Sequence, residues 1–192
     1  GEAYLVRFAD DFLIMFQYER DAQRVYEAII RRMELFGLEL SKEKTRILPF
    51  GRNCGTRETF DFLGFTHFNS KTRKGYYSVG HKISRKKKKQ FKSNLKKWVK
   101  ENRDKQFDEF MKKLNKKLTG SFNYYSLSGM IREVRSLWIH SLYVTFKWMN
   151  RRSQRRSFKL ERFYEIWHER IIHPYIHVDI WSGDKVIYNK KV

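Results

Sequence analysis

The chain has 192 residues, of which 41% are hydrophobic and 17% aromatic, so it can bury a core in one large or two small domains and is not disordered by composition. Lys and Arg number 42 against 21 Asp and Glu, and the net charge of +21 indicates a polyanionic partner, either nucleic acid or an anionic membrane surface. No apolar run approaches the roughly 18 residues of a membrane span, and the many aromatic side chains, on which unpaired bases stack, favour nucleic acid.

Residues 3–16 alternate as strands do on either side of Asp10 and Asp11, which predicts a β-hairpin with the acidic pair in its turn. A helix follows, with Asp21 complementing the dipole of its first turn and Gly37 as its natural C-cap. Its apolar positions recur at helical spacing: Val25, Ile29, Met33 and Phe36.

Three more strands are predicted before residue 80. The first covers residues 38–50 and is interrupted by the polar residues 41–45. The second is Phe60–Phe65 and the third is Gly75–Val79, with residues 69–74 as the loop between them. This order of strands and one helix is an α+β pattern.

The charge is unevenly distributed along the chain. Residues 1–80 contain 13 basic and 11 acidic side chains, a net charge of +2, whereas residues 81–192 contain 29 and 10, a net charge of +19. The apolar period also becomes helical beyond Gly80. Both changes predict a domain boundary near residues 80–85.

Three amphipathic helices joined by short links predict a small bundle after this boundary. Their apolar faces consist of Phe91, Leu95, Trp98 and Val99; of Phe107, Phe110, Met111, Leu114 and Leu118; and, in a helix from Ser128 to Asn150, of Ile131, Val134, Trp138, Leu142 and Phe146. A basic stretch at residues 151–156 follows, then a helix near 160–172 and a tail that contains Trp181 and Tyr188.

The cysteine and histidine residues of the sequence do not predict a zinc site. Cys54 is the single cysteine, which excludes an internal disulfide and a zinc site built on paired cysteines, and it suits a cytoplasmic protein. His173 and His177 have the spacing of two metal ligands on a helix, but Pro174 lies between them and disfavours one continuous helix. Zinc sites also need more ligands than this pair, so we assign it no metal role.

The acidic pair has two interpretations. Asp is common in turns, so Asp10 and Asp11 could form a solvated turn with no further role. Alternatively, two carboxylates held by rigid strands are suited to Mg²⁺, which takes one or two carboxylates and completes its shell with water and substrate phosphates. Two such ions would stabilise the attacking and leaving oxygens of a phosphoryl transfer.

Three sequence blocks in one order favour the Mg²⁺ interpretation. Residues 5–12, LVRFADDF, closely resemble the reverse-transcriptase signature of an aromatic residue, a small residue and two aspartates, with Phe8 in place of the commoner Tyr. Residues 37–45 resemble the next block of that family, which ends in a Lys-Thr pair, and FDFLGF at residues 60–65 resembles its Phe-x-Phe-Leu-Gly-Phe block. Residues 120–125, GSFNYY, are similar to the Gly-Trp-x-Asn-Tyr-Tyr element of the maturase (thumb) domain. From Ala3 to at least Phe158 the chain resembles group II intron-type reverse transcriptases and maturases.

The resemblance implies an α+β fold in which part of a polymerase palm, made of antiparallel strands with a helix, precedes an all-α, thumb-like helical bundle. Residues 1–80 would be the C-terminal part of the palm, residues 81–156 the thumb/maturase bundle, and residues 157–192 a C-terminal helix and tail.

The same resemblance implies roles for individual residues. Asp10 and Asp11 would bind the catalytic Mg²⁺, and Phe8 and Ala9 would lie beneath the primer end, where the small Ala9 leaves room for the nascent strand. The segment Leu63, Gly64 and Phe65 resembles the primer-grip turn, where the absence of a side chain at Gly64 lets a sugar-phosphate backbone approach; a strand bulge is the alternative. Lys44 resembles a lysine that protonates or neutralises the leaving pyrophosphate, and a solvated loop lysine is the alternative.

The basic residues beyond Gly80 are the candidates for RNA binding. Positive charges at the start of a helix oppose its dipole, so phosphate binding explains the basic run at residues 85–89 better than folding stability does. The simpler interpretation of this run is a solvated, basic helix face. The candidates are Arg85, Lys86, Lys87, Lys88, Lys89, Lys92, Lys96, Arg151, Arg152, Arg155 and Arg156. Tyr124 and Tyr125 either pack in the bundle or stack on RNA, and packing is favoured because adjacent helical residues cannot face the same way.

A polymerase site of this family also needs an Asp from an earlier strand and the fingers, yet nine residues precede Asp10. We therefore expect this chain to be inactive alone, as a fragment, a cleavage product or one piece of a split protein whose N-terminal part is a separate segment or chain. The parent would be an RNA-directed DNA polymerase (nucleotidyltransferase) of a mobile element, which binds structured intron RNA, a template and a DNA primer. The alternatives are an RNA splicing cofactor without polymerase activity and a retron or phage-defence reverse transcriptase.

Overall fold

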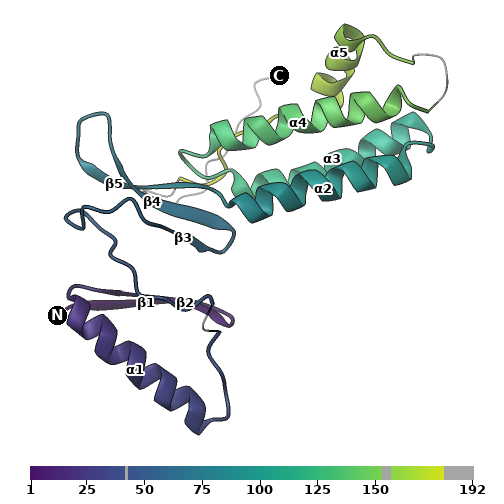
Figure 1. Ribbon diagram of the computed structural model, residues 1–192. Coiled ribbons are helices and arrows are strands. Elements are labelled where there is room, and N and C mark those ends of the chain that lie inside the picture. The colour runs from purple at the N-terminus through teal and green to yellow at the C-terminus, as the bar shows by residue number, and fades with distance from the viewer. Residues whose placement is uncertain (42, 153–156, 180–192) are drawn as a thin grey trace. The chain divides into compact units, whose positions relative to one another are not determined.

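The computed structural model describes residues 1–41, 43–152 and 157–179 (Figure 1). Five helices and two small antiparallel sheets lie in these residues, so the fold is mixed α+β, which confirms the class predicted from the sequence. The chain divides into two compact units, Gly1–Gly80 and His81–Val192. None of the helices in the described ranges combines the length and the apolar character needed to cross a membrane.

The first unit begins with an antiparallel hairpin of β1 (Ala3–Phe8) and β2 (Asp11–Phe16), in which Ala3 pairs with Phe16 and Phe8 with Asp11. Helix α1 (Glu19–Leu35) follows and lies against β2. Its first turn holds Asp21, as predicted, and its C-terminal end is closed by Gly37, whose φ of 66° places it in the left-handed region that glycine favours. The Gly37 N–H donates to the Glu34 carbonyl at 3.0 Å.

The strand predicted for residues 38–50 is wrong. None of the described residues in this range lies in a strand. Instead the N–H groups of Lys44 and Thr45 both donate to the carbonyl of Ser41, at 3.0 and 2.9 Å, and form a local turn. These two N–H groups are thus satisfied locally, and among the described residues no strand pairs with this segment.

The second sheet has the strand order β3 (Thr59–Phe62), β4 (Phe65–Lys71), β5 (Tyr77–Ile83). The strands differ from the prediction in three ways. The single strand expected at Phe60–Phe65 is divided by a two-residue turn, because Phe62 pairs directly with Phe65. Strand β4 also continues to Lys71, into the expected loop, and β5 continues past Gly80. A Cβ at Gly80 would lie 2.5 Å from the Phe68 ring, which explains a glycine inside this strand.

The second unit is built on the helices α2 (Arg85–Asn102), α3 (Phe107–Tyr125), α4 (Ile131–Met149) and α5 (Leu160–Arg170). Helices α2 and α4 lie side by side and run the same way, since Lys88 pairs with Glu133 near their starts and Lys100 lies over Trp148 near their ends (Figure 1). The predicted apolar faces supply about half of the core: Leu95, Val99, Phe110, Met111, Leu114, Leu118, Val134, Trp138 and Leu142 are buried. Five other predicted positions are half-buried: Phe91, Trp98, Phe107, Ile131 and Phe146. Phe122, Leu137, Phe163 and Trp167 are buried although they were not among the predicted positions.

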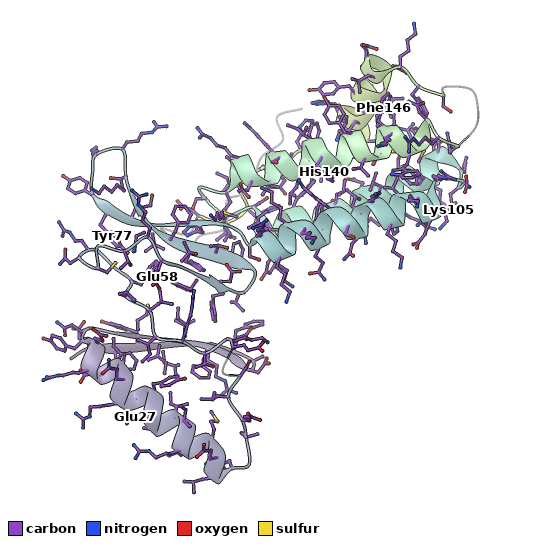
Figure 2. All side chains as sticks on the ribbon, viewed as in Figure 1. Glu27, Glu58, Tyr77, Lys105, His140 and Phe146 are labelled. Atoms are coloured by element: carbon purple, nitrogen blue, oxygen red, sulfur yellow. The ribbon has the colours of Figure 1, made fainter. Side chains whose placement is uncertain are left out.

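Helix α5 and the segment after it close the core. The rings of Phe146 on α4 and Phe163 on α5 lie 5.5 Å apart, and Figure 2 shows Phe146 directed toward α5. The indole N–H of Trp138 donates to the carbonyl of Ile172 at 3.1 Å. The helix ends at Arg170, so His173 and His177 do not share a helix, as predicted. Trp181 and Tyr188 lie outside the described residues.

Phe110 is fully buried, so Phe110→Ala is expected to lower the free energy of unfolding of the second unit by about 3–5 kcal/mol. All five Trp residues belong to residues 81–192, so urea unfolding followed by Trp fluorescence reports this unit alone. The control is Tyr143→Ala, whose side chain is 54% exposed and which should change the free energy by about 0.5 kcal/mol at most. Equal effects of the two substitutions would contradict the assigned core.

Candidate functional site

The acidic pair lies at the tip of the β1–β2 hairpin. Because Phe8 pairs with Asp11, the two-residue loop consists of Ala9 and Asp10, and Asp11 is the first residue of β2. The expected turn of Asp10 and Asp11 is therefore displaced by one residue. Ala9 has a φ of 54°, a left-handed conformation that costs a residue with a Cβ about 1–2 kcal/mol. Such strain is found preferentially at functional sites.

Both carboxylates are accessible from solvent. Asp10 and Asp11 are exposed, as is every residue of β1, so a ligand can reach the tip of the hairpin. The carbonyl of Ala9 accepts a hydrogen bond from Nε of Arg7 at 2.9 Å, which ties the loop to the strand before it. Two carboxylates on adjacent residues of a tied hairpin are hard oxygen donors and fit the ligand preference of Mg²⁺.

The hairpin alone does not complete a metal site. Among the described residues no group of three or more His, Cys, Asp or Glu side chains could hold a metal ion. Two carboxylates are nonetheless enough for Mg²⁺ when substrate phosphates and water supply the remaining ligands. The chemistry of the donors therefore fits an ion that is shared with a substrate.

A second strained turn joins β3 to β4. Leu63 and Gly64 form its two-residue loop, with φ values of 49° and 82°. Positive φ at both central positions is the signature of a type I′ hairpin turn. Glycine adopts this conformation readily, whereas Leu63 does so at a cost, so the loop is a specific structure and not the strand bulge considered as an alternative. Phe65 is the first residue of β4.

Lys44 is exposed in the local turn that starts at Ser41. No hydrogen bond or ion pair between described residues joins its side chain to Asp10 or Asp11. The structure therefore brings Asp10 and Asp11 together in one hairpin without bringing Lys44 to them.

The basic run at residues 85–89 opens α2. The hydroxyl of Ser84 caps this helix by accepting from the Lys87 N–H at 3.4 Å, which offsets part of the unfavourable charge at its start. Lys88 is half-buried and its Nζ lies 3.0 Å from Glu133 Oε2, so this lysine ties α2 to α4. The other basic residues of the run are exposed, which leaves them accessible to phosphates: Arg85, Lys86, Lys87 and Lys89.

The other predicted RNA-binding residues divide between α2 and the end of α4. Lys96 is exposed and Lys92 half-buried on α2. Arg151 and Arg152 directly follow α4, whereas Arg155 and Arg156 lie outside the described residues. Of the two adjacent tyrosines, Tyr125 is buried and Tyr124 is 53% exposed, which agrees with the expectation that they face different ways.

Sequence reasoning missed a cluster of cations around Trp148. Lys100, Arg103 and Arg151 each place their charge within 6 Å of the centre of this ring. Arg151 lies 48 residues beyond Arg103 in the sequence, so local patterns could not group it with the two cations of α2. The spacing of basic residues along α2 was the one available signal.

Comparison with protein families divides the chain in the same way. Residues 2–67 match the model of the family described as reverse transcriptase (RNA-dependent DNA polymerase), and residues 88–165 match that of the group II intron, maturase-specific domain. The acidic hairpin and the Leu63–Gly64 turn lie in the first match, and most of α2 with all of α3 and α4 lies in the second. The search of curated proteins produced no match to the chain.

The conformation of Ala9 predicts which residues the hairpin tolerates. Ala9→Gly should preserve or strengthen the β1–β2 pairing, because glycine adopts a positive φ without strain, whereas Ala9→Val should weaken it by about 1 kcal/mol or more. Amide hydrogen exchange across β1 and β2 measures this. The control is Ala3→Val in the same strand, where valine is favourable. Equal loss of protection in the two Val variants would contradict the turn geometry.

Proposed function

Since the chain belongs to the group II intron type of reverse transcriptase and maturase, we propose that Asp10 and Asp11 are metal-binding carboxylates of an RNA-directed DNA polymerase. The observation that carries this proposal is the coincidence of the acidic hairpin with the reverse transcriptase match, followed in the same chain by a basic bundle within the maturase-specific match.

The two carboxylates would bind Mg²⁺ together with phosphates of the incoming nucleotide. When bound, Mg²⁺ neutralises charge on the phosphates and stabilises the attacking and leaving oxygens of the displacement. The hairpin contributes position: the register of β1 and β2 fixes both carboxylates relative to one backbone, and the bond from Arg7 to the Ala9 carbonyl restrains the loop.

The residues around the pair would form the seat of the primer. We assign Phe8 and Ala9 to the surface beneath the primer end and Leu63, Gly64 and Phe65 to the primer grip. The exposed Phe8 ring offers an apolar surface, and the small Ala9 leaves space for the nascent strand. At Gly64 a backbone can approach without a side chain in the way. Lys44, which is exposed, would act on the leaving pyrophosphate once the complete site brings it to the acidic pair.

The second unit would bind RNA. Residues 81–192 carry a net charge of +19, and their basic side chains project from helices whose apolar faces are buried in the bundle. Phosphate contacts release counterions and supply most of the affinity of such a surface. We assign residues 1–80 to the palm, residues 81–156 to the thumb/maturase bundle and residues 157–192 to a C-terminal helix and tail, with intron RNA, template and DNA primer as ligands.

A third carboxylate and further palm structure would complete the catalytic site. The hairpin leaves large apolar side chains exposed, among them Tyr4, Leu5, Val6, Phe8 and Met15. Exposed apolar side chains grouped on one hairpin indicate a surface that another segment covers. We propose that polymerase residues carrying the further metal ligand pack there, either upstream in the same protein or in a second chain, and that synthesis requires them.

The polymerase assignment predicts the effect of removing the two charges. In the protein completed with its upstream polymerase part, Asp10→Asn with Asp11→Asn should abolish Mg²⁺-dependent extension of a DNA primer on an RNA template, because an amide cannot replace an anionic ligand of Mg²⁺. Extension is followed by gel electrophoresis of a labelled primer. Glu27→Gln on the exposed surface of α1 is the control and should extend normally. Retained extension in the double variant would exclude the catalytic assignment.

The RNA-binding assignment predicts a steep salt dependence. If the chain contacts about five phosphates, a plot of log affinity against log salt should have a slope of about −3.5 to −4.5. Fluorescence anisotropy with a labelled structured RNA gives this slope. Changing Arg85, Lys86 and Lys89 to Gln should make it shallower by about two to three, whereas changing the exposed Arg24, Arg31 and Arg57 to Gln should leave it nearly unchanged. Weak binding that does not respond to salt would count against this role.

A further inference from the structure

Trp148 organises a cation cluster at the C-terminal ends of α2 and α4. The Lys100 ammonium lies 5.0 Å from the ring centre, the Arg103 guanidinium 5.6 Å and the Arg151 guanidinium 5.4 Å. We call these four residues the Trp148 cluster. A single cation over a Trp ring is a common packing contact, but three on one ring place like charges close together, where they repel one another.

The cluster is held in place by bonds between the two helix ends. Nη1 of Arg103 donates to the carbonyl of Arg151, and Nη1 of Arg152 donates to the carbonyl of Arg103, both at 3.4 Å. The negative end of each helix dipole also favours cations at these positions. The positive charges are thus positioned in advance and do not have to be gathered by a ligand, which lowers the entropy cost of binding one.

Protein carboxylates neutralise little of this charge. Nε of Arg103 lies 3.9 Å from Asp104, the outer limit of an ion pair. No ion pair involves Lys100 or Arg151 in the part of the chain that the structure describes. The cluster therefore has the charge to bind an external anion.

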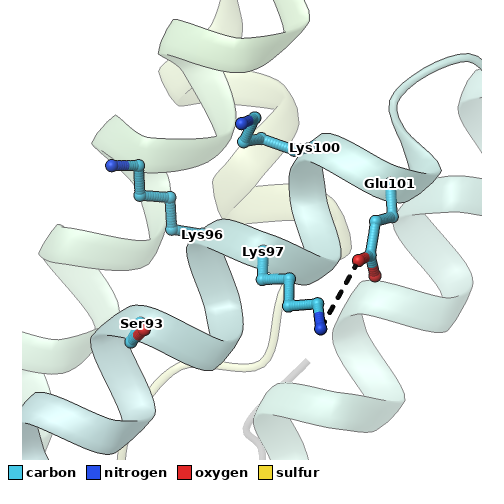
Figure 3. A pocket seen from close by; sticks show the side chains of 5 residues that line it. All are labelled: Ser93, Lys96, Lys97, Lys100 and Glu101. Carbon is cyan, nitrogen blue, oxygen red and sulfur yellow. Dashed lines mark ion pairs between the residues drawn. The ribbon is translucent and has the colours of Figure 1, made fainter.

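A stripe of basic residues on α2 leads to the cluster. Its members, separated by three or four positions and so on one face of the helix, are Arg85, Lys89, Lys92, Lys96, Lys100 and Arg103. Arg103 continues the helical backbone as the C-cap, with φ −60° and ψ −22°. Lys96 and Lys100 line a pocket of about 410 Å³ together with Ser93, Lys97 and Glu101 (Figure 3). Within this lining Lys97 pairs with Glu101 at 3.9 Å.

This face of α2 is the one beside α4. Lys92 and burial together hold the pKa of His140 on α4 below its usual value, with burial the larger cause, and Lys100 contacts Trp148 on the same helix. The stripe runs over 19 residues, from Arg85 to Arg103, or about 27 Å of helix.

We propose that the Trp148 cluster binds a phosphate of the RNA backbone and forms the far end of a phosphate-binding track along α2. This rests on the proposed RNA-binding function and assigns it a surface, adding Lys100, Arg103 and Trp148 to the residues expected from the sequence. A membrane surface fits less well, because a helix that lies in the membrane interface buries an exposed apolar face there. The apolar side chains of α2 face the bundle, and none of its large ones is among the exposed residues in the described part of the chain.

The test compares two triple variants that remove equal charge from the whole chain. One changes Lys100, Arg103 and Arg151 to Gln, and the other changes the exposed Lys112, Lys116 and Arg135 to Gln. Affinity for a labelled RNA hairpin is measured by anisotropy from 50 to 300 mM KCl. The cluster variant should bind about tenfold or more weakly at 100 mM, with a slope shallower by about two to three, and the control should change its slope by less than about one.

Two further variants separate charge from folding. Lys100→Arg with Arg103→Lys and Arg151→Lys retains the charge and should restore most of the slope. Lys100→Gln alone breaks no hydrogen bond between described residues, and it should still make the slope shallower by about 0.7–0.9 if the triple variant unfolds.

Four outcomes would overturn the inference. Equal slopes for the two triple variants would show that only total charge matters. If the wild-type chain binds RNA and the cluster variant has the same slope, this site is refuted and the RNA-binding function remains. If the wild-type chain does not bind RNA, the RNA-binding function itself is refuted. Binding of the wild-type chain to vesicles of 30% phosphatidylserine, tighter than to RNA and lost in the cluster variant, would assign the cluster to membranes.

Discussion

The register of the β1–β2 hairpin is the constraint on which the candidate catalytic site depends. Pairing of Phe8 with Asp11 leaves only Ala9 and Asp10 in the loop, so both carboxylates are fixed by one short ladder. A shift of one residue would move every side chain to the opposite face of the strands. The strain at Ala9 is the local consequence of turning the chain in two residues without a glycine. A glycine would relieve this strain, and the presence of the strain agrees with a site where the position of the side chains takes precedence over stability.

The basic bundle depends on a different balance. Its helices bury large side chains such as Phe110, Phe122 and Trp167 completely, and this burial opposes the repulsion among the cations on its surface. A few ion pairs, such as that of Lys88 with Glu133, join the helices. Around Trp148 three cations are gathered, and the one ion pair that they make in the described part of the chain is that of Arg103 with Asp104 at 3.9 Å. A polyanion would relieve that repulsion, so the same charges that oppose folding favour RNA binding.

Periodicity predicted the elements that have one clear apolar face. The helix that Gly37 follows and the three bundle helices are predicted by apolar residues that recur every three to four positions. The first hairpin is predicted by apolar residues that alternate with polar ones. The failures arose where local rules compete. FDFLGF looks like one strand because five of its six residues are apolar or aromatic or glycine, yet the left-handed conformations of Leu63 and Gly64 reverse the chain inside it. The described residues between 38 and 50 pair with no strand, and the N–H groups of Lys44 and Thr45 bond to the carbonyl of Ser41 instead.

The site was predictable only as far as it is local in sequence. Asp10 and Asp11 are neighbours, so a motif could identify them, although the motif placed the turn one residue too late. The Trp148 cluster joins residues from two helices, and its members become a group only once α2 and α4 pack in parallel. Helical spacing on α2 aligns Lys96 with Lys100, but nothing in that spacing indicates which aromatic ring lies beside them.

The central claim is that the acidic hairpin binds a divalent metal. It is tested most directly by replacing Mg²⁺ with Fe²⁺ in the completed polymerase bound to primer and template, and mapping the backbone cleavage that ascorbate and peroxide produce near the bound iron. The expected result is cleavage close to Asp10 and Asp11 that excess Mg²⁺ suppresses and that Asp10→Asn with Asp11→Asn abolishes. Cleavage elsewhere, or cleavage at the hairpin that persists in the double variant, would contradict the assignment of the metal site.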